Sequence, residues 1–189
     1  MSFDKTYFEG ELIDLSVVSD FENMEFIECQ FTSLDLTGFS FKFSKLIECH
    51  FTKCNLSNAN MANTSLRDVQ FIDSKLLGIN WSVAQTTFQL SFLRSILDLC
   101  VFQGLDLVAA KFIESSLKEV DFSDSKLMKA SFAETDLLNT IFNNSNLAKA
   151  DLRGALNYYL EPEFTVIKNA RFSMPEAMGL FKGLGIIVE

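Results

Sequence analysis

The sequence predicts an all-β fold, a right-handed β-helix with four-sided coils that ends in a short C-terminal helix. Three observations predict it. A large apolar residue returns at every fifth position, and a smaller residue returns two positions before each large one. Only two Pro and eight Gly occur in 189 residues, so these residues do not divide the chain into separate elements. The repeat is therefore expected to form one continuous domain.

The large apolar positions form two unbroken runs, which is the mark of a repeat architecture. The first run extends from Phe21 to Trp81 and the second from Phe92 to Leu152, with thirteen positions in each and a slip of one residue between them. Twelve of the 20 Phe occupy these positions, which indicates a core role and not a platform for stacking on bases. The core-repeat residues that we expect to face the axis along the rod are Phe31, Phe51, Phe71, Phe92, Phe112 and Phe132.

A period of five excludes both regular secondary structures. On an α-helix, five steps of about 100° place the next large side chain roughly 140° around the axis, so no apolar stripe forms. On a straight strand, the odd period sends successive large residues to opposite faces. A short extended stretch followed by a corner buries the pattern, and four such sides close a coil of about 20 residues. Coils stacked about 4.8 Å apart then number about six and a half.

The pattern divides the chain into three segments. Residues 1–18 are expected to form an N-terminal cap or first coil, and residues 19–154 the repeat itself. Residues 155–189 are expected to form a C-terminal segment for capping and dimerisation, because the five-residue rhythm ends after Leu152.

A helix is predicted near the C-terminus. Ser173 is expected to be its N-cap, with Glu176 as the second half of a capping box and Gly185 as the stop. Its apolar face either caps the last coil or pairs with a second copy, and we favour a homodimer because the segment carries more apolar groups than one coil end needs. The dimerisation candidates are Met178, Leu180, Phe181, Leu184, Ile186 and Ile187.

Negative charge is concentrated at the N-terminal end. The net charge is -9, and residues 1–41 contain nine acidic residues and one Lys, which leaves about -1 for the rest of the chain. This charge disfavours direct nucleic-acid binding, because phosphates would be repelled. It either keeps a Phe-rich rod soluble or presents carboxylates to a basic groove of a partner protein. The partner-binding candidates are Glu22, Glu25, Glu28, Asp35, Glu48 and Asp68.

Three of these acids recur at a spacing of 20 residues. Glu28, Glu48 and Asp68 should therefore form a vertical ladder of carboxylates about 4.8 Å apart, an arrangement that repels itself and does not favour folding. After the slip, Lys129 and Lys149 fall in the same column, so the acidic ladder does not run along the whole rod.

The sequence carries no catalytic or cofactor motif. The single histidine, His50, precedes an inward Phe and is expected at the surface. No glycine-rich phosphate loop, paired-histidine metal motif or nucleophile elbow occurs, so we expect no enzyme activity, cofactor or metal site. Four cysteines fall in the column of small residues, and we interpret them as buried free thiols in preference to a disulfide or a metal site: Cys29, Cys49, Cys54 and Cys100.

No apolar run approaches the roughly 20 residues that a membrane span needs. The first ten residues are acidic where a signal peptide would be basic and then apolar. We expect a cytoplasmic protein without a membrane segment.

The columns of small, acidic or amide, and large apolar residues over 19–154 resemble the pentapeptide-repeat family, whose fold is the right-handed quadrilateral β-helix. The resemblance is narrower at residues 25–31, EFIECQF, and at residues 170–180, ARFSMPEAMGL. There the chain is similar to a bacterial subgroup that includes quinolone-resistance proteins, mycobacterial fluoroquinolone-resistance proteins, and immunity proteins for microcin-type and albicidin-type toxins.

The resemblance implies a protein that binds DNA gyrase or topoisomerase IV and protects it from a poison. In the subgroup, the C-terminal helix pairs two copies, and the long acidic dimer is viewed as a mimic of duplex DNA. Plasmid-type quinolone-resistance proteins also project loops from their coils, whereas a slip of one residue is too short for a loop. The resemblance therefore favours a loopless immunity protein or a mycobacterial-like member. The alternative is an interaction scaffold with a partner that is not a topoisomerase.

Overall fold

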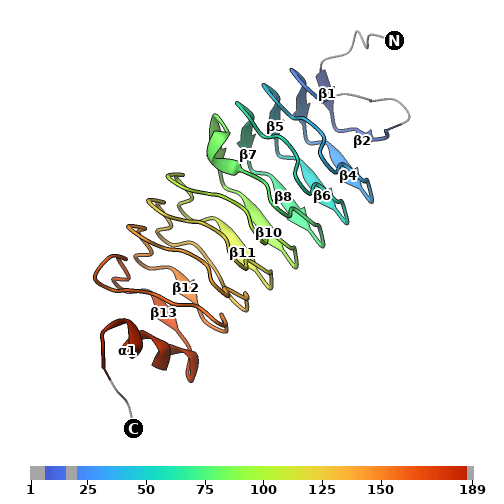
Figure 1. Cartoon of the computed structure of the whole chain (residues 1–189). Coiled ribbons are helices and arrows are strands. Elements are labelled where there is room, and N and C mark those ends of the chain that lie inside the picture. The colour runs from blue at the N-terminus through green and yellow to red at the C-terminus, as the bar shows by residue number, and fades with distance from the viewer. Residues whose placement is uncertain (1–6, 16–20, 187–189) are drawn as a thin grey trace.

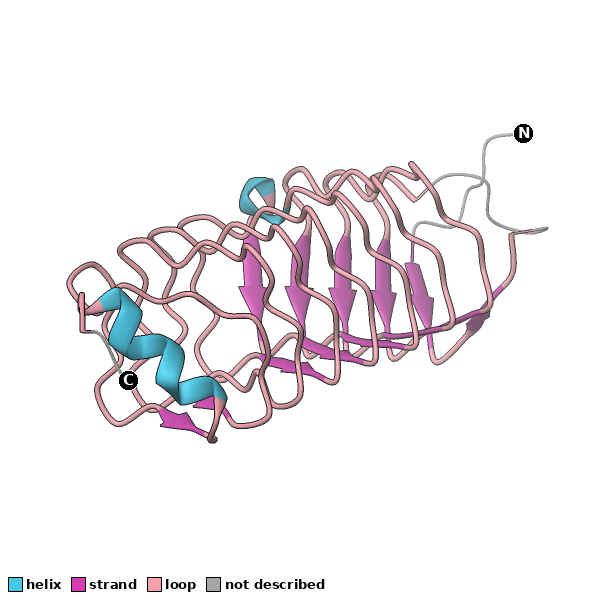
Figure 2. Cartoon of the chain, turned by 60° about the horizontal axis from the view of Figure 1, so that its bottom comes forward, coloured by secondary structure: helices cyan, strands magenta, loops and turns pink. Residues whose placement is uncertain are grey.

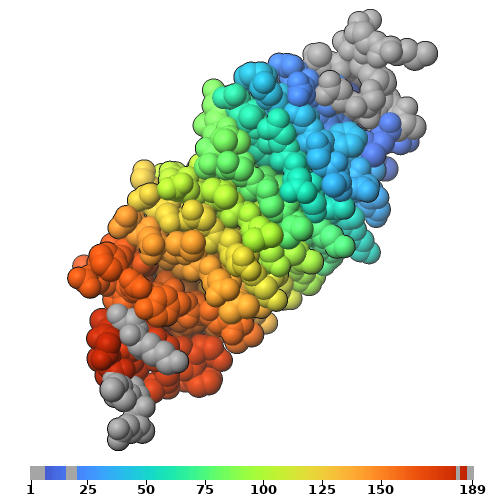
Figure 3. Space-filling view, in the orientation of Figure 1, coloured from blue at the N-terminus to red at the C-terminus, as the bar shows by residue number. Residues whose placement is uncertain are grey.

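The chain forms one long solenoid whose coils follow one another in sequence order from end to end (Figures 1 and 3). The structure, a computed structural model, describes residues 7–15 and 21–186. The predicted all-β solenoid with a short C-terminal helix is confirmed. It makes about eight turns and not six and a half, because segments at both ends of the repeat add further coil to the rod.

Two walls of the rod are parallel β-sheets in which each strand pairs with the strand one coil away (Figure 2). The β1–β9 wall is ordered β1-β3-β5-β7-β9 and consists of β1 (Tyr7–Glu9), β3 (Glu25–Ile27), β5 (Lys45–Ile47), β7 (Ser65–Arg67) and β9 (Thr86–Phe88). The β2–β11 wall is ordered β2-β4-β6-β8-β10-β11 and consists of β2 (Leu12–Ile13), β4 (Gln30–Thr32), β6 (His50–Thr52), β8 (Gln70–Ile72), β10 (Ser91–Leu93) and β11 (Lys111–Ile113).

The remaining coils continue these walls with single bridges and one further strand pair, β12 (Asp151–Leu152) with β13 (Arg171–Phe172). Partners are 18 residues apart in the first coil, as in Phe8 with Phe26, and 20 apart in the coils from β3 to the slip and again after it. Across the slip they are 21 apart, as in Phe71 with Phe92. The five-residue period therefore places chemically equivalent positions directly above one another.

Apart from the corner at Val83, each corner of the repeat between Phe21 and Leu152 is built by a residue in the left-handed backbone region, two positions after the large inward residue. Glu28, for example, has a φ of 54°. The polar residue before the large one stabilises the turn, because its side chain accepts the amide of the residue two positions on, which directly precedes the corner residue. Asp35 accepts the Thr37 amide at 3.1 Å and its hydroxyl at 2.6 Å. This hydrogen bonding explains the preference for Asp and Asn at that position.

Two aromatic columns fill the core. Along the β2–β11 wall, the rings of Phe31, Phe51, Phe71, Phe92, Phe112 and Phe132 are fully buried and stack with centroid distances of 4.1 to 5.2 Å. A second column lies on another wall, where the rings of Trp81 and Phe102 stack with a centroid distance of 5.6 Å. The two columns meet edge to face, as the rings of Phe71 and Trp81 do at a centroid distance of 5.7 Å. Most large inward positions on the other two walls carry leucine.

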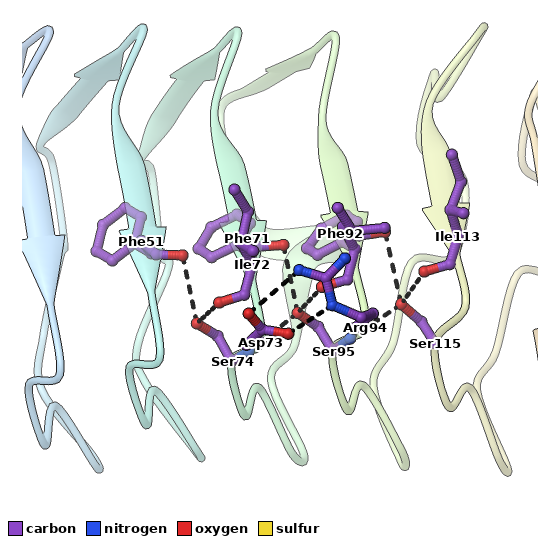
Figure 4. A network of polar contacts seen from close by, with 11 residues as sticks. Phe51, Phe71, Ile72, Asp73, Ser74, Phe92, Arg94, Ser95, Ile113 and Ser115 are labelled. Carbon is purple, nitrogen blue, oxygen red and sulfur yellow. Dashed lines mark hydrogen bonds and ion pairs between the residues drawn. The ribbon is translucent and has the colours of Figure 1, made fainter.

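The small inward column satisfies backbone groups that face the core. The Ser95 hydroxyl accepts the amide of Ser74 at 3.1 Å and donates to the carbonyl oxygen of Phe71 at 3.3 Å (Figure 4). Ser74 and Ser115 make the equivalent contacts one coil to either side. These buried hydroxyls are thus hydrogen-bonded, as burial of a polar group requires.

The cysteines occupy the same small column. All four are buried free thiols, as the sequence pattern predicts. Burial raises the pKa of the Cys49 and Cys100 thiols to about 12. Neither group is a thiolate near neutral pH, so these thiols are not nucleophiles in the folded rod.

The slip in the repeat forms a small projection and leaves a gap in one column. A 3₁₀ turn, η1 (Trp81–Val83), takes up the extra residue and protrudes from the rod (Figure 2). On the next strand Thr87 pairs with Leu66 and stands where the other coils of the β1–β9 wall carry Phe or Leu. Thr87 is only partly buried, whereas Leu66 and Leu107 are fully or almost fully buried.

Substituting Thr87→Leu should therefore raise the free energy of unfolding by about 1 kcal/mol, because it restores an apolar side chain between two buried leucines. Urea denaturation followed by circular dichroism measures the change. Thr86→Leu is the control, because Thr86 is exposed on the same strand. A gain of the same size in the control, or a loss in Thr87→Leu, would show that the slip leaves no apolar vacancy.

The winding continues beyond Leu152, which corrects the expectation that the rhythm ends there. The positions of the small inward column keep the five-residue spacing and are buried, although Leu160 is a large residue: Ala155, Leu160 and Thr165. The first two of the four large positions of this coil are Asn157 and Pro162, so the apolar repeat is interrupted before Ile167 and Phe172 resume it. The coil closes where Val166 bridges to Asn146 and β13 pairs with β12.

The C-terminal helix is present, but its predicted cap is wrong. A 3₁₀ turn, η2 (Glu176–Met178), leads into α1 (Gly179–Gly183), and the residue at the cap, Pro175, makes no side-chain capping bond. The Ser173 hydroxyl instead accepts the Gly154 amide of the preceding coil at 2.9 Å. Ser173 therefore anchors the segment to the rod, because its hydroxyl is the acceptor for the partly buried amide of Gly154.

Candidate partner-binding surface

The structure brings together four of the six acidic candidates. Glu25, Glu28, Glu48 and Asp68 lie on the β1–β9 wall or at its corner with the β2–β11 wall. Asp35 bridges to Asn55 on the wall that follows the β2–β11 wall, so it faces elsewhere. Glu22 follows the inward Phe21 on the wall before the β1–β9 wall and is also separate from the group.

Glu28, Glu48 and Asp68 stack at the same corner, which we call the acidic corner. The amides of Glu28 and Glu48 donate to carbonyl oxygens one coil further on, each at 2.9 Å. The expected repulsion is partly offset, because Arg67 lies 3.8 Å from Glu48 and 3.9 Å from Asp68. Sequence analysis missed this cation, although Arg67 directly precedes Asp68 and lies 19 positions after Glu48.

A second cation lies at the start of the strands on the same wall, where Lys45 pairs with Glu25 at 3.4 Å. These pairs are about half exposed, so each contributes at most about 1 kcal/mol to stability. Four carboxylates and two cations leave the group with a net charge of -2. The acidic corner is therefore a negative surface whose charge is only partly compensated.

A hollow of about 360 Å³ lies at the end of the acidic corner, beside the slip. It forms where the corner residues are Gln89 and Ala109, the second of which has too small a side chain to fill the space. The hollow is lined by Asp68, Gln70, Gln89, Leu90, Ser91, Ala109 and Lys111. The sequence alone does not predict this hollow, because the hollow depends on side chains from three successive coils.

Acidic residues further along the rod are held by local cations. Asp73 accepts two hydrogen bonds from Arg94, at 2.7 and 3.2 Å, and these hold the pKa of its carboxyl below the usual range (Figure 4). Arg153 lowers the pKa of Asp151 in the same way, with a 2.6 Å contact. Asp73 thus joins its coil to the next one, whereas Asp151 pairs within its own coil. Both carboxylates are less available to a partner than the acidic corner.

The C-terminal helix has one face toward the rod and one toward solvent. Leu180 packs against the core, and Met178 is partly buried. Phe181, Leu184 and Ile186 are 38%, 55% and 48% exposed and form an apolar surface at the end of the rod. Ile187, the remaining dimerisation candidate, lies outside the described residues.

Within residues 7–15 and 21–186, no cluster of three or more His, Cys, Asp or Glu side chains is arranged to hold a metal ion. A search of the same part of the chain finds no helix with the length and apolar character to cross a bilayer. His50 is partly buried between Gln30 and Gln70 of the neighbouring coils.

Two sequence signatures of one family match the chain. The signature described as "Pentapeptide repeat region" matches residues 24–98, and that described as "Pentapeptide repeats (8 copies)" matches residues 95–132 and 129–156. Together they cover the greater part of the sequence. Comparison with curated proteins gives no significant match.

Solved structures with a similar fold include two trypsin-treated variants of QnrB1, described as a plasmid-mediated fluoroquinolone resistance protein. One has a TM-score of 0.68 and 15% identity, covering 98% of both chains. The other has a TM-score of 0.66 and 16% identity, covering 98% of this chain and 99% of that one. At such identities the likeness shows a shared fold.

Proposed function

This chain belongs to the pentapeptide-repeat family, and from that premise we propose that it binds a type II topoisomerase, DNA gyrase or topoisomerase IV, and protects it from a poison. The poison is either an antibiotic or a toxin against which the protein gives self-immunity. The protein acts by binding and not by catalysis. A homodimer through Phe181, Leu184 and Ile186 places the two acidic corners at the far ends of a double-length rod.

The observation that carries the proposal is the acidic corner on a rigid rod. Its carboxylates repeat at about 4.8 Å, the spacing between coils, so they present a regular row of negative charge. A groove that binds DNA is lined with cations that neutralise phosphates. Such a groove attracts a regular row of carboxylates for the same electrostatic reason, and steering by this field accelerates encounter at low salt.

The fold likeness adds a second support. It extends over 98% of this chain and 98% of a QnrB1 variant, so the whole rod and not one segment is matched. QnrB1 is described as a fluoroquinolone resistance protein, and we extend that role in general form, as protection of a topoisomerase, to this chain.

The test is a supercoiling and DNA-cleavage assay with gyrase and topoisomerase IV, each with a panel of poisons. Protection at micromolar protein is expected for at least one enzyme and poison. Glu28→Lys/Glu48→Lys/Asp68→Lys should weaken enzyme binding at least about tenfold and flatten its salt dependence, because the attractive charge is reversed.

A matched control changes the charge by the same amount elsewhere. Glu114→Lys/Glu119→Lys/Glu134→Lys alters three exposed glutamates that also occupy left-handed corner positions, but on other corners. It should bind like the unmodified protein. If both triple variants bind equally well, the acidic corner is not the interface. If neither enzyme is bound or protected, the proposal fails, and affinity capture of another partner would then favour a scaffold.

A further inference from the structure

The acidic corner is one end of a column whose charge reverses along the rod. After Gly10 in the first coil, the corner residues in coil order are Glu28, Glu48, Asp68, Gln89, Ala109, Lys129, Lys149 and Asn169. Three acids, two uncharged residues and two lysines therefore follow one another at the same corner. Lys129 and Lys149 are exposed, and neither forms an ion pair with any residue that the structure describes.

A partly apolar column runs beside this corner on the β1–β9 wall. After Glu9 in the first coil, it consists of the residues that directly precede the corner, in the order Ile27, Ile47, Arg67, Phe88, Val108, Met128, Ala148 and Lys168. Phe88 is 56% exposed, and Ile27, Ile47, Val108 and Met128 are partly exposed. An aromatic ring exposed to this extent in the middle of a wall is the kind of surface that a binding partner covers.

The two columns are complementary to themselves when one copy is turned end for end. With a two-fold axis between the coils of Gln89 and Ala109, Glu48 lies opposite Lys149 of a second copy, and Asp68 lies opposite its Lys129. Two-fold symmetry repeats both pairs, which gives four contacts between opposite charges. In the apolar column, Phe88 lies opposite Val108 of the second copy and Ile47 opposite its Ala148.

The third column of this wall fits the same arrangement. It consists of the first residue of each strand or bridge. After Tyr7 it runs Glu25, Lys45, Ser65, Thr86, Asp106, Lys126, Asn146 and Val166. End-for-end pairing sets Lys45 against Asn146 of the second copy and Ser65 against its Lys126, so no like charges meet. A parallel arrangement, with the two-fold axis along the rods, reverses the order of the columns across the wall. Glu28 then faces Glu25 and Lys129 faces Lys126 of the second copy, and only Glu48 faces a cation, Lys45, so repulsion disfavours this arrangement.

We propose that the β1–β9 wall is a self-association surface, on which a second copy of this chain packs side by side and antiparallel. This contact is separate from the C-terminal helix, so a protein that uses both surfaces assembles beyond a dimer. It does not rest on the proposed function. It does cover the acidic corner, so a second copy and a basic partner compete for Glu48 and Asp68.

The test is sedimentation velocity of the full chain over a range of protein and salt concentrations. One association step should weaken as salt rises, since its charged contacts are screened. Lys129→Glu/Lys149→Glu and Glu48→Lys/Asp68→Lys should each weaken that step at least about tenfold, because four attractive contacts become repulsive. Mixing the two variants in equal amounts should restore it, because opposite charges face each other again in the mixed pair.

Glu114→Lys/Glu119→Lys is the control and should associate like the unmodified chain. Circular dichroism verifies that each variant is folded, and only small losses of stability are expected, because the exposed ion pairs of Arg67 with Glu48 and Asp68 each contribute at most about 1 kcal/mol. The proposal is overturned if the lysine and acid variants associate like the control, or if their mixture stays as weak as each alone. Since no topoisomerase is present, this outcome is independent of the test of the proposed function.

Discussion

Phe71→Ala is expected to lower the free energy of unfolding by about 3–5 kcal/mol, the range for removing a buried aromatic side chain. Phe71 is fully buried and stacks on Phe51 at 5.0 Å and on Phe92 at 5.1 Å. The Phe71 ring also packs edge to face against Trp81, with a centroid distance of 5.7 Å. The cavity would remain open, because stacked coils hold the neighbouring rings in register and leave them little freedom to collapse. In a solenoid such a loss also weakens the coupling between the two halves of the rod.

Denaturation in urea, followed by circular dichroism, measures this loss. Phe43→Ala is the matched control, because Phe43 is 52% exposed at a corner. It should change stability by no more than about 0.5 kcal/mol. Equal losses in the two variants would contradict the assignment of the inward column. A second, earlier unfolding transition in Phe71→Ala would show that the rod separates into halves at this coil.

Ala110→Asp should prevent folding or lower the free energy of unfolding by more than about 4 kcal/mol. Ala110 is 1% exposed in the small inward column, between Leu90 and Ala130. A carboxylate there would be surrounded by apolar side chains without a cation, and an unpaired buried charge is among the most destabilising single changes.

The adjacent residue provides a sharp control for this substitution. Ala109 is exposed at the corner, with a φ of 60°, and Asp tolerates that backbone region better than most residues. Ala109→Asp should therefore leave stability within about 0.5 kcal/mol of the unmodified protein. Thermal unfolding at low protein concentration compares the two. Similar losses at 109 and 110 would contradict the five-residue phase of the inward positions.

The candidate site was only partly predictable from sequence. Glu28, Glu48 and Asp68 were expected to stack, because the 20-residue coil follows directly from the period, and they do. Arg67 beside them was not expected, since its ion pairs depend on how a side chain on one coil leans toward the next. Asp35 and Glu22 are candidates for the same acidic partner-binding surface, but a four-sided coil sends neighbours a few residues apart to different walls.

The end of the rod was missed for a related reason. Asn157 and Pro162 break the apolar pattern, yet the coil continues because Ala155, Leu160 and Thr165 still face inward and the backbone still pairs with the coil before it. The exposed backbone and core side chains at the end of one coil act as a template. The next segment can therefore pair with that coil even when its own apolar five-residue repeat is weak. Ser173 likewise serves an amide of the preceding coil, which no local capping rule foresees.

By itself, the sequence determined the period, the inward side chains and hence the solenoid, because a fifth-position repeat has no other way to remove its large residues from water. Tertiary structure decided which outward residues meet, since contacts between coils join positions 20 or 21 residues apart that local patterns treat as unrelated. The charge reversal along one corner, the hollow beside the slip and the exposed Phe88 exist only at that level, where equivalent positions of successive coils share a surface.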